Sequence, residues 1–367
     1  MYTLKRYYGF HTKKYTNGQI ADMTVFQSYQ IQKMYFSRAW IYGARSRSVP
    51  VTYVVYSDGK PVLLFPALEG KHSIVIAGST NGICSLSPIY LGDTDAYEDA
   101  LMFCLKKMPC KTIRIDRLFE DSRTARMLNS NIEWAEITSK TDENVRIKFE
   151  NGYDAWQSTL KKSVRQNMRT AYNRCNTDGL SVRFELYYGG KISSKIMKNL
   201  VKIYNDRHAV RYGVKTSTLK RIYMEYFDFS TKSLKNNENA RHGVLYLNDQ
   251  IAGFFSGYYD AGTQSIVVPR LSIDPEFERY SPGYMLINET IRYYENDDDV
   301  VCLDLSTGVE KYKTDLGGGG LFKRQLYFNA FIRNAIAIFL TPAIKWITMS
   351  SFIIHIRNIE EMDIQAY

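Results

Sequence analysis

The feature that most constrains the fold is a series of elements that occurs twice. Two β-hairpins are predicted, at residues 52–68 with a turn at Asp58-Gly59 and at residues 243–259 with a turn at Asp249-Gln250. Each is followed by further strand, a helix and a last strand. The second turn comes 191 residues after the first, and Asp304 in the second last strand comes 188 residues after Asp116 in the first. Two similarly built α/β domains in tandem would give this nearly constant shift.

The helix of the second half begins in a way that suits an anion. In residues 277–289 (FERYSPGYMLINE), Ser281 is predicted to be the N-cap, its hydroxyl accepting from the first turn, and Pro282 the first helical residue. The free N–H groups and the helix dipole attract negative charge. We expect a strand at 263–273 before this helix, a helix end near Tyr294 and a strand at 300–306.

Only the second half is predicted to hold a phosphorylated cofactor. The first helix, at about 94–107, has acids in or near its opening turn that would repel a pyrophosphate: Asp93, Asp95, Glu98 and Asp99. The second helix start has no acid from Arg279 until Glu289, and Arg270 and Arg279 are basic neighbours.

Composition limits the class of protein. With 367 residues and 45% hydrophobic content, the chain is globular and long enough for about two domains. The five cysteines form no C-x-x-C pair and the five histidines no H-x-x-x-H pair, so we expect no disulfide scaffold and no metal. The net charge of +10, with eight Lys/Arg against Asp22 alone in residues 1–50, indicates either an anionic partner or a solvated surface.

The C-terminal tail is apolar, and Lys345 is its only charge between residues 334 and 355. Two short amphipathic helices that break near Pro342 and lie on the body or on a membrane surface are preferred to a membrane span. No signal peptide is visible, so we expect a cytoplasmic protein. If the tail lies on a membrane, the protein would be peripheral at the inner membrane surface. The predicted domains are 1–150, 151–328 and the tail 329–367.

The second half resembles a known family. The order of hairpin, strand, Y-S-P-G turn, helix, D-L-S-T-G strand and V-E-K-Y-K segment resembles CelD/BcsL-type acyltransferases of the GNAT superfamily, most clearly over residues 151–328. Those enzymes are related in architecture to the FemAB aminoacyltransferases, which carry two tandem GNAT-like domains. The resemblance implies an α/β (α+β) fold of two tandem GNAT-like domains, each a mixed, mostly antiparallel sheet flanked by helices.

The resemblance also implies a site. The turn matches the family's pyrophosphate-binding motif except that Gly283 comes one place late and no second glycine follows. The implied donor-binding residues are Arg279, Tyr280, Ser281, Pro282, Gly283 and Tyr284 in the turn and Val268 and Arg270 in the strand before it. The implied catalytic residues are Asp304, Glu310 and Lys313, with Tyr258, His208 and Asp260 as further candidates for acid or base. Asp304 or Ser306 would point toward the reacting carbonyl.

The function implied is transfer of an acyl group from acetyl-CoA or another acyl-CoA to an amino group of a sugar or cell-envelope polysaccharide precursor, which includes lipid-linked acceptors. Two alternatives stay open: a FemAB-like transferase that uses aminoacyl-tRNA, and a non-catalytic scaffold in polysaccharide synthesis. Between the halves, residues 155–175 predict a helical face of apolar residues and a basic row of Lys161, Arg165 and Arg169. That row would meet donor phosphates, an anionic acceptor or only solvent.

Overall fold

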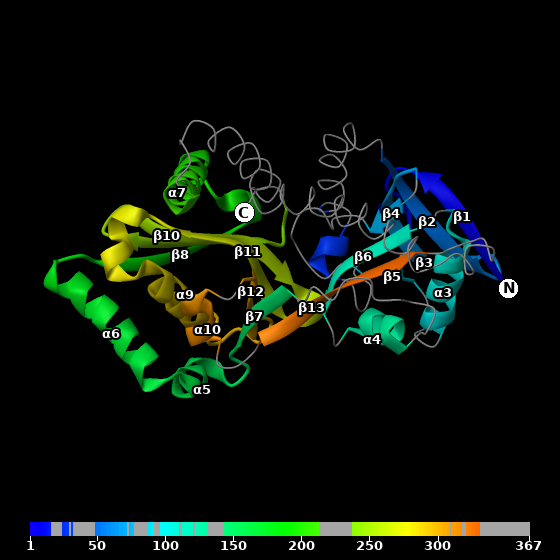
Figure 1. Ribbon diagram of the computed structural model, residues 1–367. Coiled ribbons are helices and arrows are strands. Elements are labelled where there is room, and N and C mark those ends of the chain that lie inside the picture. Colours follow the sequence, from blue (N-terminus) through cyan, green and yellow to red (C-terminus); the bar gives the residue numbers. More distant parts are fainter. Residues whose placement is uncertain are drawn as a thin grey trace, which may run out of the picture. The chain divides into compact units, whose positions relative to one another are not determined.

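The structure is a computed structural model that describes residues 1–15, 24–28, 31, 48–71, 73–76, 87–91, 96–109, 112–119, 122–130, 142–212, 237–308, 310–317 and 321–330. The chain divides into unit 1, residues 1–20, 32–141 and 325–367, and unit 2, residues 21–31 and 142–324 (Figure 1). The predicted C-terminal tail lies outside the described residues from 331 onward, and the predicted domain boundaries stay a prediction.

Unit 1 is a sheet with helices. Its strands, in their order across the sheet, are β1 (Tyr2–Tyr8), β2 (Val49–Ser57), β3 (Lys60–Glu69), β4 (Ser73–Ile76) and β6 (Thr112–Phe119), and the short β5 (Ile89–Tyr90) pairs with β3. The helices are α1 (Thr12–Tyr15), α3 (Tyr97–Lys107) and α4 (Arg123–Ser130). Neighbouring strands are antiparallel except β4 and β6. The Asp58-Gly59 turn is confirmed, with φ of 47° and 78°.

Unit 2 repeats this order. Its strands across the sheet are β8 (Val182–Tyr188), β9 (Ala240–Leu247), β10 (Gln250–Asp260), β11 (Ser265–Ile273), β12 (Cys302–Thr307) and β7 (Asp142–Lys148), and β7 also pairs with the first residues of β13 (Leu321–Ala330). The α-helices are α5 (Gly152–Thr159), α6 (Lys162–Thr177), α7 (Ser194–Tyr212), α9 (Pro282–Tyr293) and α10 (Lys311–Leu316). Short 3-10 helices are Val25–Gln27, Gly189–Lys191, Ala261–Thr263 and Pro275–Tyr280.

The two units confirm the tandem prediction. In each, an antiparallel run of four strands is followed by a helix and then by a strand parallel to the fourth: β1-β2-β3-β4-α3-β6 in unit 1 and β8-β9-β10-β11-α9-β12 in unit 2. Each parallel contact consists of three residue pairs. The predicted fold class, two mixed and mostly antiparallel sheets flanked by helices, is therefore confirmed.

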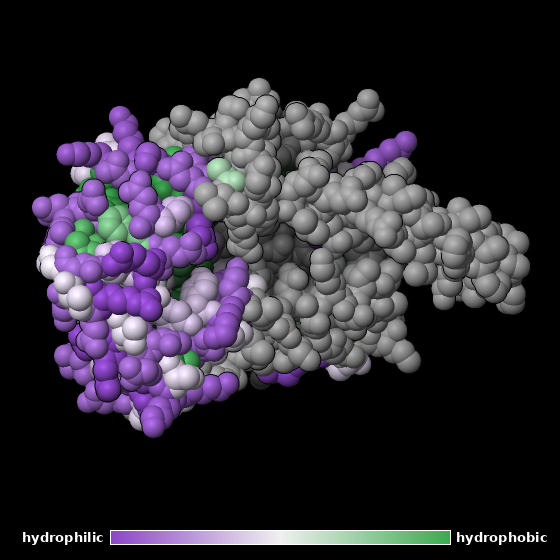
Figure 2. All heavy atoms as spheres, turned by 60° about the vertical axis from the view of Figure 1, so that its left-hand side comes forward, coloured by the Kyte–Doolittle hydropathy of each residue, from purple (hydrophilic) through white to green (hydrophobic). Residues whose placement is uncertain are grey.

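The sheet of unit 2 is covered on both faces. Helix α7 packs on one face against β9 and β10, while α6 and α9 pack on the other (Figure 1). All six apolar residues predicted for the helical face at 155–175 are buried: Trp156, Leu160, Val164, Met168, Ala171 and Cys175. In Figure 2 the described surface in view is mainly hydrophilic, and Tyr293 is the one exposed large hydrophobic side chain among the described residues of unit 2.

Three local details differ from the sequence prediction or refine it. The second hairpin turns at Asn248-Asp249, one residue earlier than predicted, because Asn248 takes the left-handed conformation at φ 53°.

The 155–175 segment is two helices, because Leu160 and Lys161 are extended between α5 and α6. Arg165 of the basic row donates to the carbonyl of Leu160 at 2.7 Å and of Ser158 at 3.1 Å, where α5 ends. That residue therefore caps a helix end.

A bulge interrupts the pairing of β10 with β11. Ser256 pairs with Arg270 and Tyr258 with Val267, so that Gly257 alone lies opposite two residues of β11, one of them Pro269. A Cβ on Gly257 would lie 2.1 Å from the backbone oxygen of Val267. Only glycine permits the two backbones to approach so closely.

We therefore expect Gly257→Ala to lower the free energy of unfolding by about 2 to 4 kcal/mol, because the atom that the new methyl meets is backbone and cannot rotate away. Urea unfolding of the variant and of Gly253→Ala measures this. Gly253 lies in the same strand, and the closest atom to a Cβ there is 3.4 Å away. Equal losses in the two variants would contradict the prediction.

Candidate functional site

The site is organised by two strands that separate. β11 and β12 pair in parallel from Ser265 and Cys302 to Val267 and Asp304, and no further pair forms between them although β11 continues to Ile273. The bulge with Pro269 begins where the pairing ends. Backbone groups on that side of β11 are consequently left without ladder partners in β12, and an extended ligand with amide groups could bind them.

Helix α9 connects these two strands, and its first turn is the predicted anion site. Ser281 is the N-cap and Pro282 follows at the first helical position, as predicted, but the Ser281 side chain forms no capping hydrogen bond. The prediction of a hydroxyl cap was wrong because Ser281 also ends the preceding 3-10 helix. In this left-handed conformation, at φ 53°, its N–H donates to Glu278 and its carbonyl accepts from Tyr284.

The turn has room in front of Gly283. A Cβ there would meet only a methyl of Ile273, at 3.8 Å. The turn's own basic residue is already engaged: Arg279 forms an ion pair with Asp178, whose carboxylate also accepts from the Tyr280 hydroxyl at 2.7 Å. The Tyr284 hydroxyl donates to Asp315 at 2.9 Å. The six predicted turn residues therefore lie together, and a phosphate would compete with Asp178 for Arg279.

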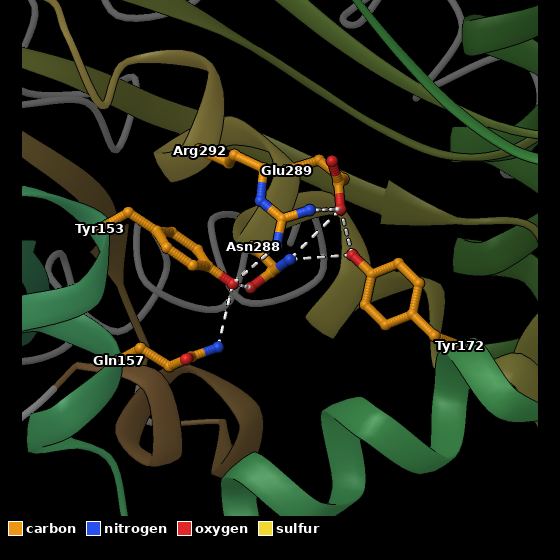
Figure 3. Close-up of polar contacts among 6 residues, drawn as sticks. All are labelled: Tyr153, Gln157, Tyr172, Asn288, Glu289 and Arg292. Atoms are coloured by element: carbon orange, nitrogen blue, oxygen red, sulfur yellow. Dashed lines mark hydrogen bonds and ion pairs between the residues drawn. The ribbon is translucent and has the colours of Figure 1, made fainter.

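Figure 3 shows what fixes the other end of α9. The Asn288 amide donates to the Tyr172 hydroxyl of α6 at 2.9 Å, and its oxygen accepts from the Tyr153 hydroxyl of α5 at 2.8 Å. Tyr172 also donates to Glu289, and Arg292 lies within hydrogen-bond distance of the Tyr153 hydroxyl. Because Asn288 is 1% exposed, this network locks α9 against α5 and α6.

A row of side chains crosses the sheet where β11 and β12 part. Tyr258, Val267, Asp304 and Arg146 are successive partners on four neighbouring strands. Tyr258 is 2% exposed, and its ring meets that of Phe26 edge-on at 5.4 Å. This predicted acid or base is therefore buried under the 24–28 segment.

Asp260, at the end of β10, also contacts the 24–28 segment. Its carboxylate accepts from the Val25 N–H at 2.9 Å and from the Thr263 hydroxyl at 2.8 Å. Burial raises the pKa of Asp260 above its ordinary value.

Asp304 is the centre of a buried polar cluster. One of its oxygens accepts from the Asn144 amide at 2.7 Å and from the Ser306 N–H at 2.8 Å, and the other accepts from Arg146 at 3.1 Å. A carboxylate oxygen that accepts this many bonds fits an anchor better than a proton acceptor. Asp304 is 1% exposed, so it acts through the groups that it holds.

Two atoms of this cluster have no hydrogen-bond partner among the described residues: Asn144 Oδ1 and Ser306 Oγ, both buried. The Asn144 side-chain nitrogen must face Asp304, because only the nitrogen can donate to a carboxylate. The amide oxygen is therefore left as an acceptor without a described partner. Ser306 has φ 58° in the irregular part of β12, a conformation that non-glycine residues rarely adopt. Sequence reasoning missed Asn144, because a polar residue in a short charged strand gives no signal until the strand's neighbour is known.

The predicted pair Glu310 and Lys313 lies just beyond. Lys313 Nζ is 3.0 Å from Glu310, and Gly308 at φ 105° leaves the space that they use, since a Cβ there would be 2.6 Å from the Glu310 carboxylate. Lys313 is 7% exposed, whereas the Glu310 side chain is 36% exposed. Glu310 is consequently the most accessible carboxylate of the predicted set.

Part of the chain matches a known protein family. Residues 162–314 match the family model described as acetyltransferase (GNAT) domain. This segment, less than half of the chain, is therefore similar to a GNAT domain. The match supports transferase activity, and no curated protein sequence matches the chain significantly.

Solved structures extend the likeness to the tandem arrangement. The chain is similar to FemX with 10% identity and a TM-score of 0.60, over 91% of this chain and 99% of FemX. It is also similar to a conserved protein of unknown function from Bacteroides thetaiotaomicron VPI-5482 with 11% identity and a TM-score of 0.51, over 81% of this chain and 90% of that one. Identities this low show the fold alone.

The remaining predicted residues fall on both faces of the sheet of unit 2. Val268 is in the core beneath α9, and Arg270 lies on the opposite face in a row with Ser256 and His242. His208 is in α7, and its side chain is outside the described part. In the described residues no cluster of metal-binding side chains occurs and no helix is long and apolar enough to cross a membrane.

His242 is fully buried in that row, and its Nδ1 lies 2.9 Å from the Ser256 hydroxyl. Burial lowers its pKa to about 4, because the charged imidazolium is poorly solvated there. An unfolded histidine titrates near pH 6.5. Between these two values the unfolded chain therefore binds more protons than the folded one.

We expect the resulting stability to be fully present above about pH 6.5 and lost as the pH falls toward 4, by about 3 kcal/mol in total. Urea unfolding at several pH values measures this against His242→Gln, which has no imidazole to protonate. The variant's stability should fall less steeply across this interval. Parallel curves for the two proteins would show that His242 does not cause the loss.

Proposed function

We propose that the GNAT-type domain transfers an acyl group from an acyl-CoA thioester to an amino group. The observation that carries the proposal is the separation of β11 from β12 beyond Val267, with α9 beginning near the open end. A pantetheine arm is an extended chain with two amides, which fits an unpaired strand edge, and a pyrophosphate fits the N–H groups of a helix start. Gly283 keeps that helix start uncovered.

The reaction joins the amine nitrogen to the acyl carbon and breaks the carbon–sulfur bond. The attacking amine must lose a proton, and the departing thiolate must gain one. We assign Asn144 Oδ1 to accept an N–H of the amine and the Ser306 hydroxyl to donate to the oxygen that becomes negative. Glu310 is the candidate base because its side chain is 36% exposed, and Lys313 holds its buried oxygen Oε2 in place.

The acceptor class we propose is an amino group on a sugar or cell-envelope polysaccharide precursor, free or linked to a lipid. The support for this is the resemblance of the turn and the D-L-S-T-G strand to CelD-like acyltransferases. A lipid-linked acceptor would suit a tail that contacts the inner membrane surface from the cytoplasm, as proposed for residues 329–367.

Donor binding is tested by calorimetric titration of acetyl-CoA into wild type, Gly283→Glu and Gly283→Ala. We expect micromolar affinity in wild type and about a hundredfold loss with glutamate, whose charge would face the pyrophosphate. Alanine should bind within about threefold of wild type, because a methyl group fits at this position. Absence of binding in wild type, or equal loss in both variants, would overturn the donor assignment.

The buried hydroxyl is tested by Ser306→Gly, which removes the hydroxyl and relieves the strained φ. Acetyl transfer from acetyl-CoA to a panel of amino sugars should fall by about tenfold to a hundredfold in kcat, while acetyl-CoA affinity and folding stability are retained or improved. Ser272→Ala is the matched control, since Ser272 is also buried with an unpartnered hydroxyl but lies in β11. An unchanged kcat in Ser306→Gly would remove the hydroxyl from the mechanism.

A second candidate is a FemAB-like transfer that uses aminoacyl-tRNA, and the likeness to the FemX fold across 91% of the chain favours it. The same calorimetric series separates the two. Heat with tRNA that diminishes steeply with salt, and none with acetyl-CoA, would select the RNA donor. Heat with neither would select a scaffold without catalysis.

A further inference from the structure

A second site lies in unit 1, where three tyrosine hydroxyls meet. The hydroxyl of Tyr56 in β2 is 3.1 Å from that of Tyr7 in β1 and 2.9 Å from that of Tyr15 in α1. The three groups carry three protons but share two hydrogen bonds. One proton is therefore left to donate to something else.

Two lysines surround this chain of hydroxyls. Lys5 Nζ lies 5.0 Å from the ring centre of Tyr56, and Lys14 Nζ lies 5.5 Å from that of Tyr15 and 5.9 Å from that of Tyr7. Hydrogen bonding with Tyr56 lowers the pKa of Tyr7 most, and hydrogen bonding with Tyr15 and the charges of both lysines lower it further. Both ammonium groups consequently act on the same hydroxyl.

The positive charge here is not neutralised within the described part of the chain. Arg6, on the same strand, is matched by Glu69, which it contacts at 2.8 and 3.1 Å. Lys5 and Lys14 are exposed and form no ion pair with any described carboxylate. Lys5 and Lys14 therefore contribute positive charge that no described carboxylate offsets.

The corner between β1 and α1 holds the group together. Gly9 at φ 82° turns the chain, its N–H donates to Pro50, and its carbonyl accepts from the Thr52 hydroxyl at 2.8 Å. Thr52 also accepts from the His11 N–H at 3.3 Å. These bonds hold α1 against β2, so that Lys14 and Tyr15 of α1 reach Tyr56 of β2.

We propose that Lys5, Lys14 and the hydroxyl chain of Tyr7, Tyr56 and Tyr15 form a binding site for a phosphate monoester. Two ammonium charges match its near-dianionic charge, and two ammonium groups with one phenol proton give donors to three phosphate oxygens. A carboxylate offers one charge and two oxygens, and a phosphodiester one charge, so both match less well. The site does not depend on the acyl-transfer proposal.

Calorimetric titration of glycerol 3-phosphate into the full chain tests the proposal. We expect binding that weakens by about tenfold in Lys5→Gln/Lys14→Gln and by about threefold in Tyr7→Phe. The matched control Lys60→Gln/Lys107→Gln removes the same charge from exposed positions elsewhere in unit 1 and should bind within about twofold of wild type. No binding in wild type, or an equal loss in the control, would overturn the site.

Two further arms define the ligand. Dimethyl phosphate and acetate should bind at least about tenfold more weakly than glycerol 3-phosphate, and equal binding of either would overturn the choice of a monoester. Phosphatidylcholine vesicles doped with phosphatidic acid, compared with phosphatidylcholine vesicles doped with phosphatidylglycerol, then identify the source. Retention by phosphatidic acid that is lost in the lysine variant indicates a lipid headgroup, whereas binding of glycerol 3-phosphate without vesicle retention indicates a soluble monoester.

Discussion

The limited pairing of β11 with β12 is the constraint on which the rest of unit 2 depends. Three residue pairs hold the strands together, and the bulge with Pro269 begins directly after them. If the two strands paired along their whole length, the backbone N–H and C=O groups on this side of β11 would all be hydrogen-bonded to β12. Because the ladder stops, the sheet supplies rigid, pre-positioned donors and acceptors without any dedicated side chain. A strand edge of this kind consequently depends on the path of the backbone and not on particular side chains.

One buried carboxylate positions several of the polar groups around that opening. Asp304 receives Arg146, Asn144 and the backbone of Ser306, and these come from two neighbouring strands. Removal of any one donor would leave a buried charge less well compensated, which costs more than the bond itself contributes. The unpartnered oxygens beside it are therefore part of a rigid arrangement.

Sequence reasoning recovered the elements that local patterns specify. The Asp58-Gly59 turn, the α9 boundaries and the buried face of 155–175 follow from turn chemistry and periodicity, and the tandem order follows from a near-constant spacing. It placed the turn residues together because they are neighbours in the chain. It could not find Asn144, because β7 becomes a neighbour of β12 only after 160 residues of intervening chain have folded. It also misjudged the Ser281 side chain, since one residue both ends a 3-10 helix and begins α9.

The placement of residues 24–28 has a consequence for how the chain folds during synthesis. The Val25 N–H bonds to Asp260, which is 235 residues further along the chain, and Phe26 covers Tyr258 of the same strand. At ribosomal rates this segment must wait on the order of ten to fifty seconds for its partner strand to emerge. Until then the side chains of Val25 and Phe26, which are buried in the folded chain, lack the strand against which they pack. A nascent chain of this kind is a natural client for a chaperone, and deletion of the first unit at residue 141 would also remove part of the second.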